Sequence, residues 1–200
     1  MAVFNKCHAV FVGFLVYVIV ATVGYTINQG DFFQNEHIFI IAKTFLISLS
    51  VAYAKWFDMI SLRSLTKKEV LLFIGSFLLC VLVNIGYHSL FTVSSGAGYQ
   101  HLEASSTGIS LSFIASATVF GPILEEFIFR GILQGAVFDN SWLGLLLTSS
   151  LFSFMHDPYD VPSFFYYLLG GLLLGFAYKK SQNLSVPILV HICYNCLSFF

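Results

Sequence analysis

The sequence predicts an all-α membrane protein, a polytopic bundle of about seven transmembrane helices in a single domain covering residues 1–200. Its composition is 58% hydrophobic and 10% charged, whereas soluble globular chains carry about 25% charged residues. The hydrophobic residues gather in runs long enough to cross a bilayer as helices, which satisfy their own backbone hydrogen bonds in lipid. We therefore expect the lipid bilayer as the main partner. A net charge of −1 gives no reason to expect nucleic acid.

The first three hydrophobic runs are separated by short polar segments. They cover about residues 8–27, 37–55 and 70–91. The first run is long enough to span the membrane and has no clear cleavage site, so we interpret it as a helix and not as a signal peptide. The loop between the second and third runs is basic and contains Lys55, Arg63, Lys67 and Lys68.

The fourth run, residues 108–138, is long for one crossing. Gly121 and Pro122 in its middle predict a break, because proline cannot donate a backbone hydrogen bond inside a helix. The main helix of this run would then begin near Pro122, after a shallower leading helix. Three further runs complete the count of seven, at about 142–156, 163–178 and 184–200.

With seven crossings, the basic residues of the loops all fall on one side of the membrane: Lys6, the 55–68 loop and the pair Lys179–Lys180. The opposite loops contain acidic residues and no lysine or arginine. By the positive-inside rule, this asymmetry places the N-terminus in the cytoplasm.

Three ionisable residues interrupt the fourth run: Glu125, Glu126 and Arg130. Each costs roughly 2.5–3.5 kcal/mol near the centre of a membrane helix, so a partner or a function is expected to offset it. Glu126 and Arg130 are four residues apart and share a helical face, which predicts an ion pair that supports the structure. Glu125 points about 100° away from that face and needs another partner. We interpret it as a candidate base in a polar cavity.

Polar residues in the later runs are candidate partners for Glu125. His156 ends the fifth run, and His191 and Asn195 share one face of the last run. A single membrane histidine or asparagine often only hydrogen-bonds a neighbouring helix. Several such residues on late helices are better explained by one shared site within the membrane.

A carboxylate base, two imidazoles and an amide donor suit hydrolysis of a peptide bond by activated water. We expect Glu125 to take a proton from water with the help of His156. His191 and Asn195 would donate hydrogen bonds to the developing oxyanion, a contribution of roughly 3–4 kcal/mol in soluble proteases. This chemistry requires no cofactor. The alternative is a zinc ion held by Glu125, His156 and His191 with an open position for water, although the H-E-x-x-H helix of the zincins is absent.

Three motifs follow one another in this half of the chain: Glu125-Glu126…Arg130, Phe152…His156 and His191…Asn195. In this order they resemble the E-E-x-x-x-R, F-x-x-x-H and H-x-x-x-N motifs of the CPBP family, the CAAX proteases and bacteriocin-processing enzymes also called the Abi family. The resemblance covers about residues 108–200, which would be the catalytic helices. It implies an all-helical intramembrane endopeptidase with catalytic positions at Glu125, His156, His191 and Asn195.

The resemblance also implies a biological setting. The compact chain is similar to the bacterial branch of the family, which implies a bacterial cell-membrane protein acting in bacteriocin maturation, self-immunity or peptide processing. The family was named as metalloproteases, and a metal-free mechanism that depends on glutamate is our preferred expectation. The expected substrate is a small membrane-associated or amphipathic peptide or protein.

Two other functions are compatible with a polytopic bundle of this kind. A non-enzymatic immunity or scaffold protein would keep the fold and shield a membrane partner, but it would not need every catalytic group. A small proton-coupled transporter could use Glu125 and the histidines as a proton relay. No inverted repeat relates the two halves of the sequence, which disfavours the transporter.

Overall fold

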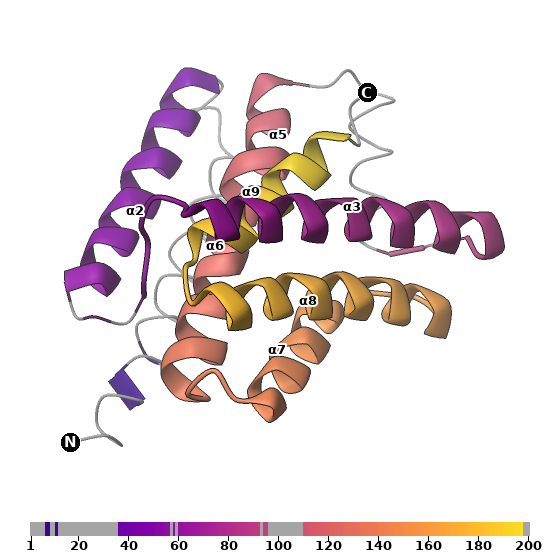
Figure 1. The fold of residues 1–200 in the computed structure, drawn as a ribbon. Helices are drawn as coiled ribbons and strands as arrows, with labels where there is room; N and C mark the ends of the chain where they lie inside the picture. The colour runs from indigo at the N-terminus through magenta and orange to yellow at the C-terminus, as the bar shows by residue number, and fades with distance from the viewer. Residues whose placement is uncertain are drawn as a thin grey trace.

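The computed structural model describes residues 7–8, 11, 36–56, 58, 60–92, 94–95 and 110–197. Every named element in these ranges is a helix (Figure 1), so the predicted all-α class is confirmed. The first predicted span lies outside the described residues except for residues 8 and 11, and the count of seven spans stays a prediction. The helices are α2 (Glu36–Trp56), α3 (Lys67–Leu90), α5 (Leu111–Ala115), η2 (Ser116–Phe120), α6 (Gly121–Glu126), η3 (Phe127–Val137), α7 (Trp142–Met155), α8 (Val161–Ser181) and α9 (Ser185–Cys196).

Three helices of the described chain are long and apolar enough to cross a membrane: α3, α8 and the continuous helix Leu111–Val137. α7 and α9 are apolar but shorter. One face of α3 leaves large apolar side chains exposed at helical spacing, and lipid can solvate such a stripe where water cannot. Its members are Leu71, Ile74, Leu78, Leu82 and Ile85. The chain is a membrane protein.

The helix Leu111–Val137, formed by α5, η2, α6 and η3, runs through Gly121 and Pro122 without the predicted break. Gly121 keeps helical dihedral angles, φ −58° and ψ −59°. The hydrogen-bonding register changes here instead, from the π-helical η2 to the α-helical α6. Gly121 N–H donates to the carbonyl of Ser116, five residues earlier. Pro122 then lies in the first turn of α6, where the missing N–H and fixed φ of proline are tolerated.

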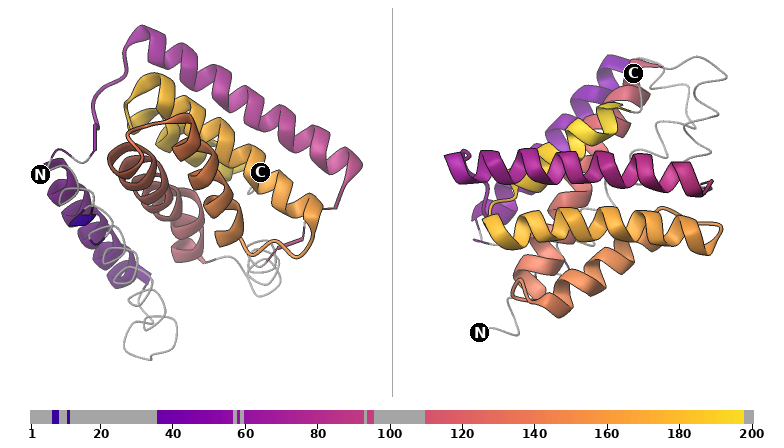
Figure 2. Two further views of the ribbon diagram at one scale, coloured as in Figure 1. Left: turned by 90° about the horizontal axis from the view of Figure 1, so that it is seen from below. Right: turned by 45° about the vertical axis from the view of Figure 1, so that its right-hand side comes forward.

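α3 and α8 lie side by side in opposite directions and cross the helix Leu111–Val137 (Figures 1 and 2). α7 packs along α8, and the two helices approach closely at Gly171. A Cβ atom on Gly171 would lie 3.1 Å from the Ser149 carbonyl oxygen and 3.2 Å from its Cα. Only a glycine therefore permits this packing without a shift of the backbone. α9 contacts α3, α8, α6 and η2, and so occupies the centre of the bundle.

The segment between α2 and α3 fixes the start of α9. The buried side-chain amide of Asn183 accepts a hydrogen bond from the Arg63 N–H (3.2 Å) and donates one to the Arg63 carbonyl (3.1 Å). The backbone N–H of the next residue, Leu184, donates to the carbonyl of Ser61 at 2.8 Å. These hydrogen bonds set the position at which α9 enters the bundle, and α9 carries two of the predicted site residues, His191 and Asn195.

Candidate active site

Three helices bring the predicted glutamate and histidines together inside the bundle. Glu125 lies near the end of α6, His156 directly follows α7, and His191 lies in the middle of α9. The Nε2 atoms of His156 and His191 are each 3.9 Å from the same oxygen, Glu125 Oε2. The structure therefore gathers three of the four predicted catalytic side chains around one point.

Glu126 and Arg130 form the ion pair that their spacing predicts. Arg130 Nη1 donates to Glu126 Oε1 at 3.0 Å, and both side chains are 0% exposed. Arg130 Nη2 also donates to the carbonyl of Gly171 in α8 at 2.9 Å, and the guanidinium carbon lies 4.5 Å from the centre of the Phe152 ring. The pair thus ties the helix of Glu125 to α8 and α7, and its role in supporting the structure stays a prediction.

Glu126 has a second partner that the sequence did not reveal. His191 Nδ1 lies 2.9 Å from Glu126 Oε1, the oxygen that also accepts from Arg130. A histidine that donates Nδ1–H to a carboxylate presents Nε2 to the opposite side. Glu126 therefore orients His191 toward Glu125. No spacing rule could have indicated this contact, because it joins residues on two different helices.

The backbone fixes the tautomer of His156 in the same way. Its Nδ1 lies 2.8 Å from the Phe152 carbonyl oxygen, which can only accept. Neutral His156 and neutral His191 both carry their proton on Nδ1 when these bonds form. Both Nε2 atoms then offer a lone pair toward Glu125, so the three atoms that converge are all hydrogen-bond acceptors.

The Glu125 side chain is partly exposed, but one of its carboxylate oxygens is buried. Its side chain is 33% exposed, compared with 17% for His156 and 6% for His191. Its Oε2 atom is buried and has no hydrogen-bond partner among the residues that the structure describes. A distance of 3.9 Å to each Nε2 is too long for a direct hydrogen bond. This separation leaves room for a small polar group that hydrogen-bonds both Glu125 and a histidine.

Asn195 has a hydrogen-bond partner on another helix. It lies one turn after His191, and its Nδ2 donates to the carbonyl oxygen of Ala117 in η2 at 2.9 Å. This hydrogen bond joins α9 to η2. The role of Asn195 as an oxyanion donor stays a prediction, and it would have to use the amide hydrogen that Ala117 does not take.

Two aromatic residues also define the site. The Phe152 ring centre lies 4.4 Å from that of His156 and 5.8 Å from that of His191. The F-x-x-x-H spacing indicates the first of these contacts, because residues four apart share a helical face. Tyr167 of α8 stacks on His156 with 4.3 Å between ring centres and an interplanar angle of 25°. Its hydroxyl is 2.7 Å from Ser95 Oγ. The sequence contained no signal for Tyr167.

The same side chains are the ones predicted to hold zinc in the metal-dependent alternative. Within the described ranges, no group of three or more histidine, cysteine, aspartate and glutamate side chains is arranged to hold a metal ion. Two ligands on one tetrahedral zinc lie roughly 3.3–3.4 Å apart, whereas each Nε2 is 3.9 Å from Glu125 Oε2. Binding of a zinc ion would therefore require each Nε2 to move about half an ångström closer to Glu125 Oε2.

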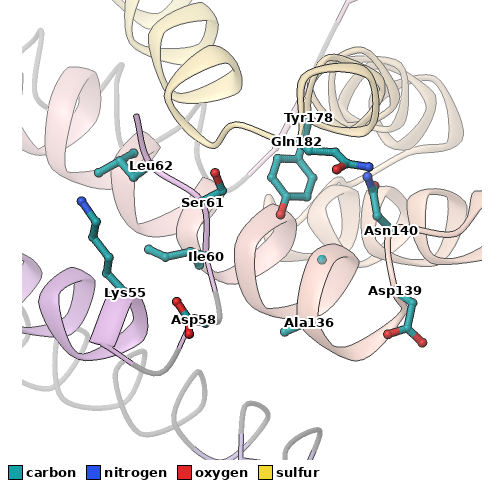
Figure 3. Close-up of a pocket in the computed structure, with 11 residues that line it drawn as sticks. Lys55, Asp58, Ile60, Ser61, Leu62, Ala136, Asp139, Asn140, Tyr178 and Gln182 are labelled. Atoms are coloured by element: carbon teal, nitrogen blue, oxygen red, sulfur yellow. The ribbon is translucent and has the colours of Figure 1, made fainter. Parts of the chain in front are cut away.

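A separate cavity of about 610 Å³ opens at the other end of η3 (Figure 3). It is lined by the end of α2, by Asp58 and residues 60–62, and by the turn that contains Asp139 and Asn140. Tyr178 of α8 closes one side. None of the predicted site residues lines this cavity, so it is not part of the site around Glu125.

Comparison with known proteins finds a family model that matches the same region. Residues 107–197 match the Rce1-like family, the type II CAAX prenyl endopeptidases. YdiL of Bacillus subtilis, provisionally named a membrane peptidase, is 35% identical over 89 residues, which are 44% of this chain and 35% of that protein. The membrane-embedded CAAX protease MroQ of Staphylococcus aureus is 28% identical over 92 residues, 42% of this chain and 36% of that protein.

A longer match extends outside the family region. The UPF0177 protein YbdJ of Lactococcus lactis is 27% identical over 188 residues, 85% of this chain and 77% of that protein. The matches to YdiL and MroQ span only about a third of those relatives. No solved structure matches the chain with significance. Residues 107–197, which carry all three motifs, thus resemble the Rce1-like family of type II CAAX prenyl endopeptidases.

Proposed function

We propose that the chain is an intramembrane endopeptidase that hydrolyses a peptide bond in a small membrane-associated peptide or protein, using water activated by Glu125. One observation carries this proposal: two histidine nitrogens from different helices converge on one carboxylate oxygen of Glu125, each at 3.9 Å. The family of residues 107–197 and the names of two relatives support a peptidase.

The first step is attack of water on the carbonyl carbon of the substrate. Glu125 Oε2 and the two Nε2 atoms are acceptors, so a water molecule among them donates its hydrogens and keeps a lone pair for the substrate. A separation of 3.9 Å allows one water oxygen to hydrogen-bond both a histidine and the glutamate. Glu125 takes a proton from the water as the new carbon–oxygen bond forms.

The second step is departure of the amine. The proton taken from water has to reach the amide nitrogen as the carbon–nitrogen bond breaks, and a histidine Nε2 beside Glu125 is placed to relay it. Once protonated, Nε2 can also donate to the oxyanion. The neutral form with its proton on Nδ1 cannot donate from Nε2. The oxyanion role predicted for His191 therefore requires its imidazolium form.

The buried pair Glu126–Arg130 supports this chemistry indirectly. Glu126 Oε1 holds His191 Nδ1 at 2.9 Å, as the carboxylate behind a catalytic histidine fixes its tautomer and direction. Arg130 donates a hydrogen bond to Glu126 and another to the carbonyl of Gly171, and so anchors Glu126 to α8. We infer that the pair sets the position of His191, whereas Glu125 acts on the substrate.

We infer further that the substrate is hydrophobic or amphipathic, because it has to reach Glu125 inside a bundle of apolar helices. A role in bacteriocin maturation, self-immunity or peptide processing in a bacterial cell membrane, with the N-terminus in the cytoplasm, belongs to the same proposal. The relatives named above come from bacteria, and one of them is named a CAAX protease.

A peptide inventory of membranes and medium tests the proposal. Cells of a native host would carry the wild type, Glu125→Gln or the matched control Asp58→Asn, which removes an exposed carboxylate outside the site. We expect peptides that appear with the wild type and with Asp58→Asn and are missing with Glu125→Gln. Identical inventories, with all three proteins inserted at equal abundance, would contradict the proposal and favour an immunity or scaffold protein.

The metal-free mechanism is tested separately with purified protein. The rate of cleavage of a peptide identified in the inventory would be measured before and after treatment with a strong chelator. The proposed mechanism predicts an unchanged rate. Loss of activity that added zinc restores would replace it with the zinc alternative, held by Glu125, His156 and His191.

A further inference from the structure

The carbonyl oxygen of Ala117 lacks both of its ordinary helical donors, the N–H groups four and five residues later. In α-helical pairing it would accept from the N–H of Gly121, and in π-helical pairing it would accept from residue 122. Gly121 N–H donates to Ser116 instead, and Pro122 has no N–H. The change of register at Gly121–Pro122 therefore takes away the α-helical and the π-helical partner of this carbonyl, and a backbone group that stays unpaired is strongly unfavourable inside a membrane protein.

Asn195 supplies the missing donor from another helix. Its Nδ2 lies 2.9 Å from the Ala117 carbonyl oxygen, in the region where α9 packs against η2. Asn195 follows His191 by one helical turn, and Ala117 precedes Glu125 by about two turns on the continuous helix. This hydrogen bond therefore joins the helix of the histidine to the helix of the glutamate, close to the point where the two side chains meet.

We propose that Asn195 is a positioning residue: its amide replaces the N–H that Pro122 lacks and so holds His191 in place against Glu125. The effect on catalysis rests on the peptidase function proposed above. The family resemblance implies a direct role for Asn195 at the oxyanion. The geometry assigns one amide hydrogen to Ala117, and the loss of this bond would let α9 shift relative to α6.

A double-mutant cycle between positions 122 and 195 tests the proposal. Pro122→Ala introduces an N–H that can donate to Ala117, five residues earlier, and so relieves the need for Asn195. The wild type, Pro122→Ala, Asn195→Ala and the double variant would be purified. Two quantities would be measured for each: the denaturant concentration at half-unfolding in mixed micelles, and kcat and KM for a peptide that the wild type cleaves.

We expect Asn195→Ala to lower kcat on the order of ten- to hundredfold with little change in KM, because a small displacement of a catalytic group is costly. The unfolding midpoint should fall as well. In the Pro122→Ala background both losses should shrink, with kcat restored to within about threefold of that of Pro122→Ala. Gln134→Ala is the matched control, since it removes a buried amide that bonds Gly175 of α8 at 2.9 Å. The losses in unfolding midpoint and in kcat caused by Gln134→Ala should be the same in both backgrounds.

Equal losses from Asn195→Ala in both backgrounds would overturn the proposal. Coupling in the unfolding midpoint without rescue of kcat would also overturn it, because Asn195 would then support the fold without positioning His191. If the wild type cleaves no peptide, the proposed function fails. The coupling of the midpoints still tests the hydrogen bond between Asn195 and Ala117 in that case, so the two failures are distinguishable.

Discussion

Replacement of Arg130 by alanine is expected to destabilise the fold much more than replacement of the base, Glu125, by glutamine. The Arg130 and Glu126 side chains are both 0% exposed. Arg130→Ala leaves the Glu126 carboxylate without its cation, and breaking a buried ion pair in this way costs about 3–5 kcal/mol. The hydrogen bond from Arg130 to Gly171 adds roughly 1 kcal/mol. The sum is a large part of the 5–15 kcal/mol that typically stabilises a folded domain.

The matched comparison is Glu125→Gln, which keeps the size of the side chain. Glu125 is 33% exposed, and the Nε2 atoms of His156 and His191 both lie 3.9 Å from its Oε2. No buried ion pair is broken, so we expect a change within about 1 kcal/mol. Both variants would be assayed by reversible unfolding of the purified protein in mixed micelles and by protein abundance in membranes. The two assays together separate a loss of folding stability from a failure of insertion.

A compensated variant sharpens this prediction. Arg130→Met together with Glu126→Gln removes both charges and keeps side chains of similar size. It should recover most of the stability that Arg130→Ala loses, because no uncompensated buried charge remains. Equal stability of Arg130→Ala and Glu125→Gln would refute the structural role that we assign to the pair.

Three further predictions concern the surroundings of the site. Gly171→Ala should lower the free energy of unfolding by about 1–3 kcal/mol, because its Cβ would lie 3.1 Å from the Ser149 carbonyl oxygen. Gly170→Ala is the control, because a Cβ at that position would meet nothing within 4 Å. Tyr167→Phe keeps the stacking on His156 and loses the hydrogen bond to Ser95, so its kcat should stay within about threefold of the wild type. Tyr167→Ala removes the ring and should lower kcat further. Equal kcat values for the two variants would contradict a role for the stacked ring. At the N-cap of α8, hydrogen bonds from Ser163 and then Ser94 lower the pKa of Asp160. Its contribution to stability should be complete above the unfolded pKa of about 3.9 and should be lost as the pH falls toward the lower folded pKa, so Asp160→Asn should weaken the dependence of the unfolding midpoint on acidic pH.

Contacts along one helix were predictable because helical spacing fixes them. The pairing of Glu126 with Arg130 and the contact of Phe152 with His156 both follow from residues four apart. The apolar runs likewise predicted the helices from α2 to α9, since the cost of unsatisfied backbone groups in lipid leaves a helical chain few alternatives. The sequence also separated Glu125 from the ion pair, because the two glutamates point in different directions from one helix.

Contacts between helices were not predictable in the same way. The rotation of each helix and the points where helices cross depend on packing, and a single sequence does not contain them directly. The bond between His191 and Glu126 and the stacking of Tyr167 on His156 depend on such crossings. The continuous path through Pro122 was missed because a register change to π-helical bonding is an alternative to a break that residue types alone do not distinguish.

The most direct test of the central claim uses purified protein reconstituted in lipid vesicles. A peptide cleaved by the wild type would be incubated in water enriched in oxygen-18 with the wild type, Glu125→Gln and the control Asp58→Asn, and the products would be weighed by mass spectrometry. We predict that the wild type and Asp58→Asn place one heavy oxygen in the new carboxyl terminus, and that Glu125→Gln is slower by at least about a thousandfold. Cleavage by folded Glu125→Gln at the rate of the wild type would contradict the assignment of Glu125 as the base that activates water.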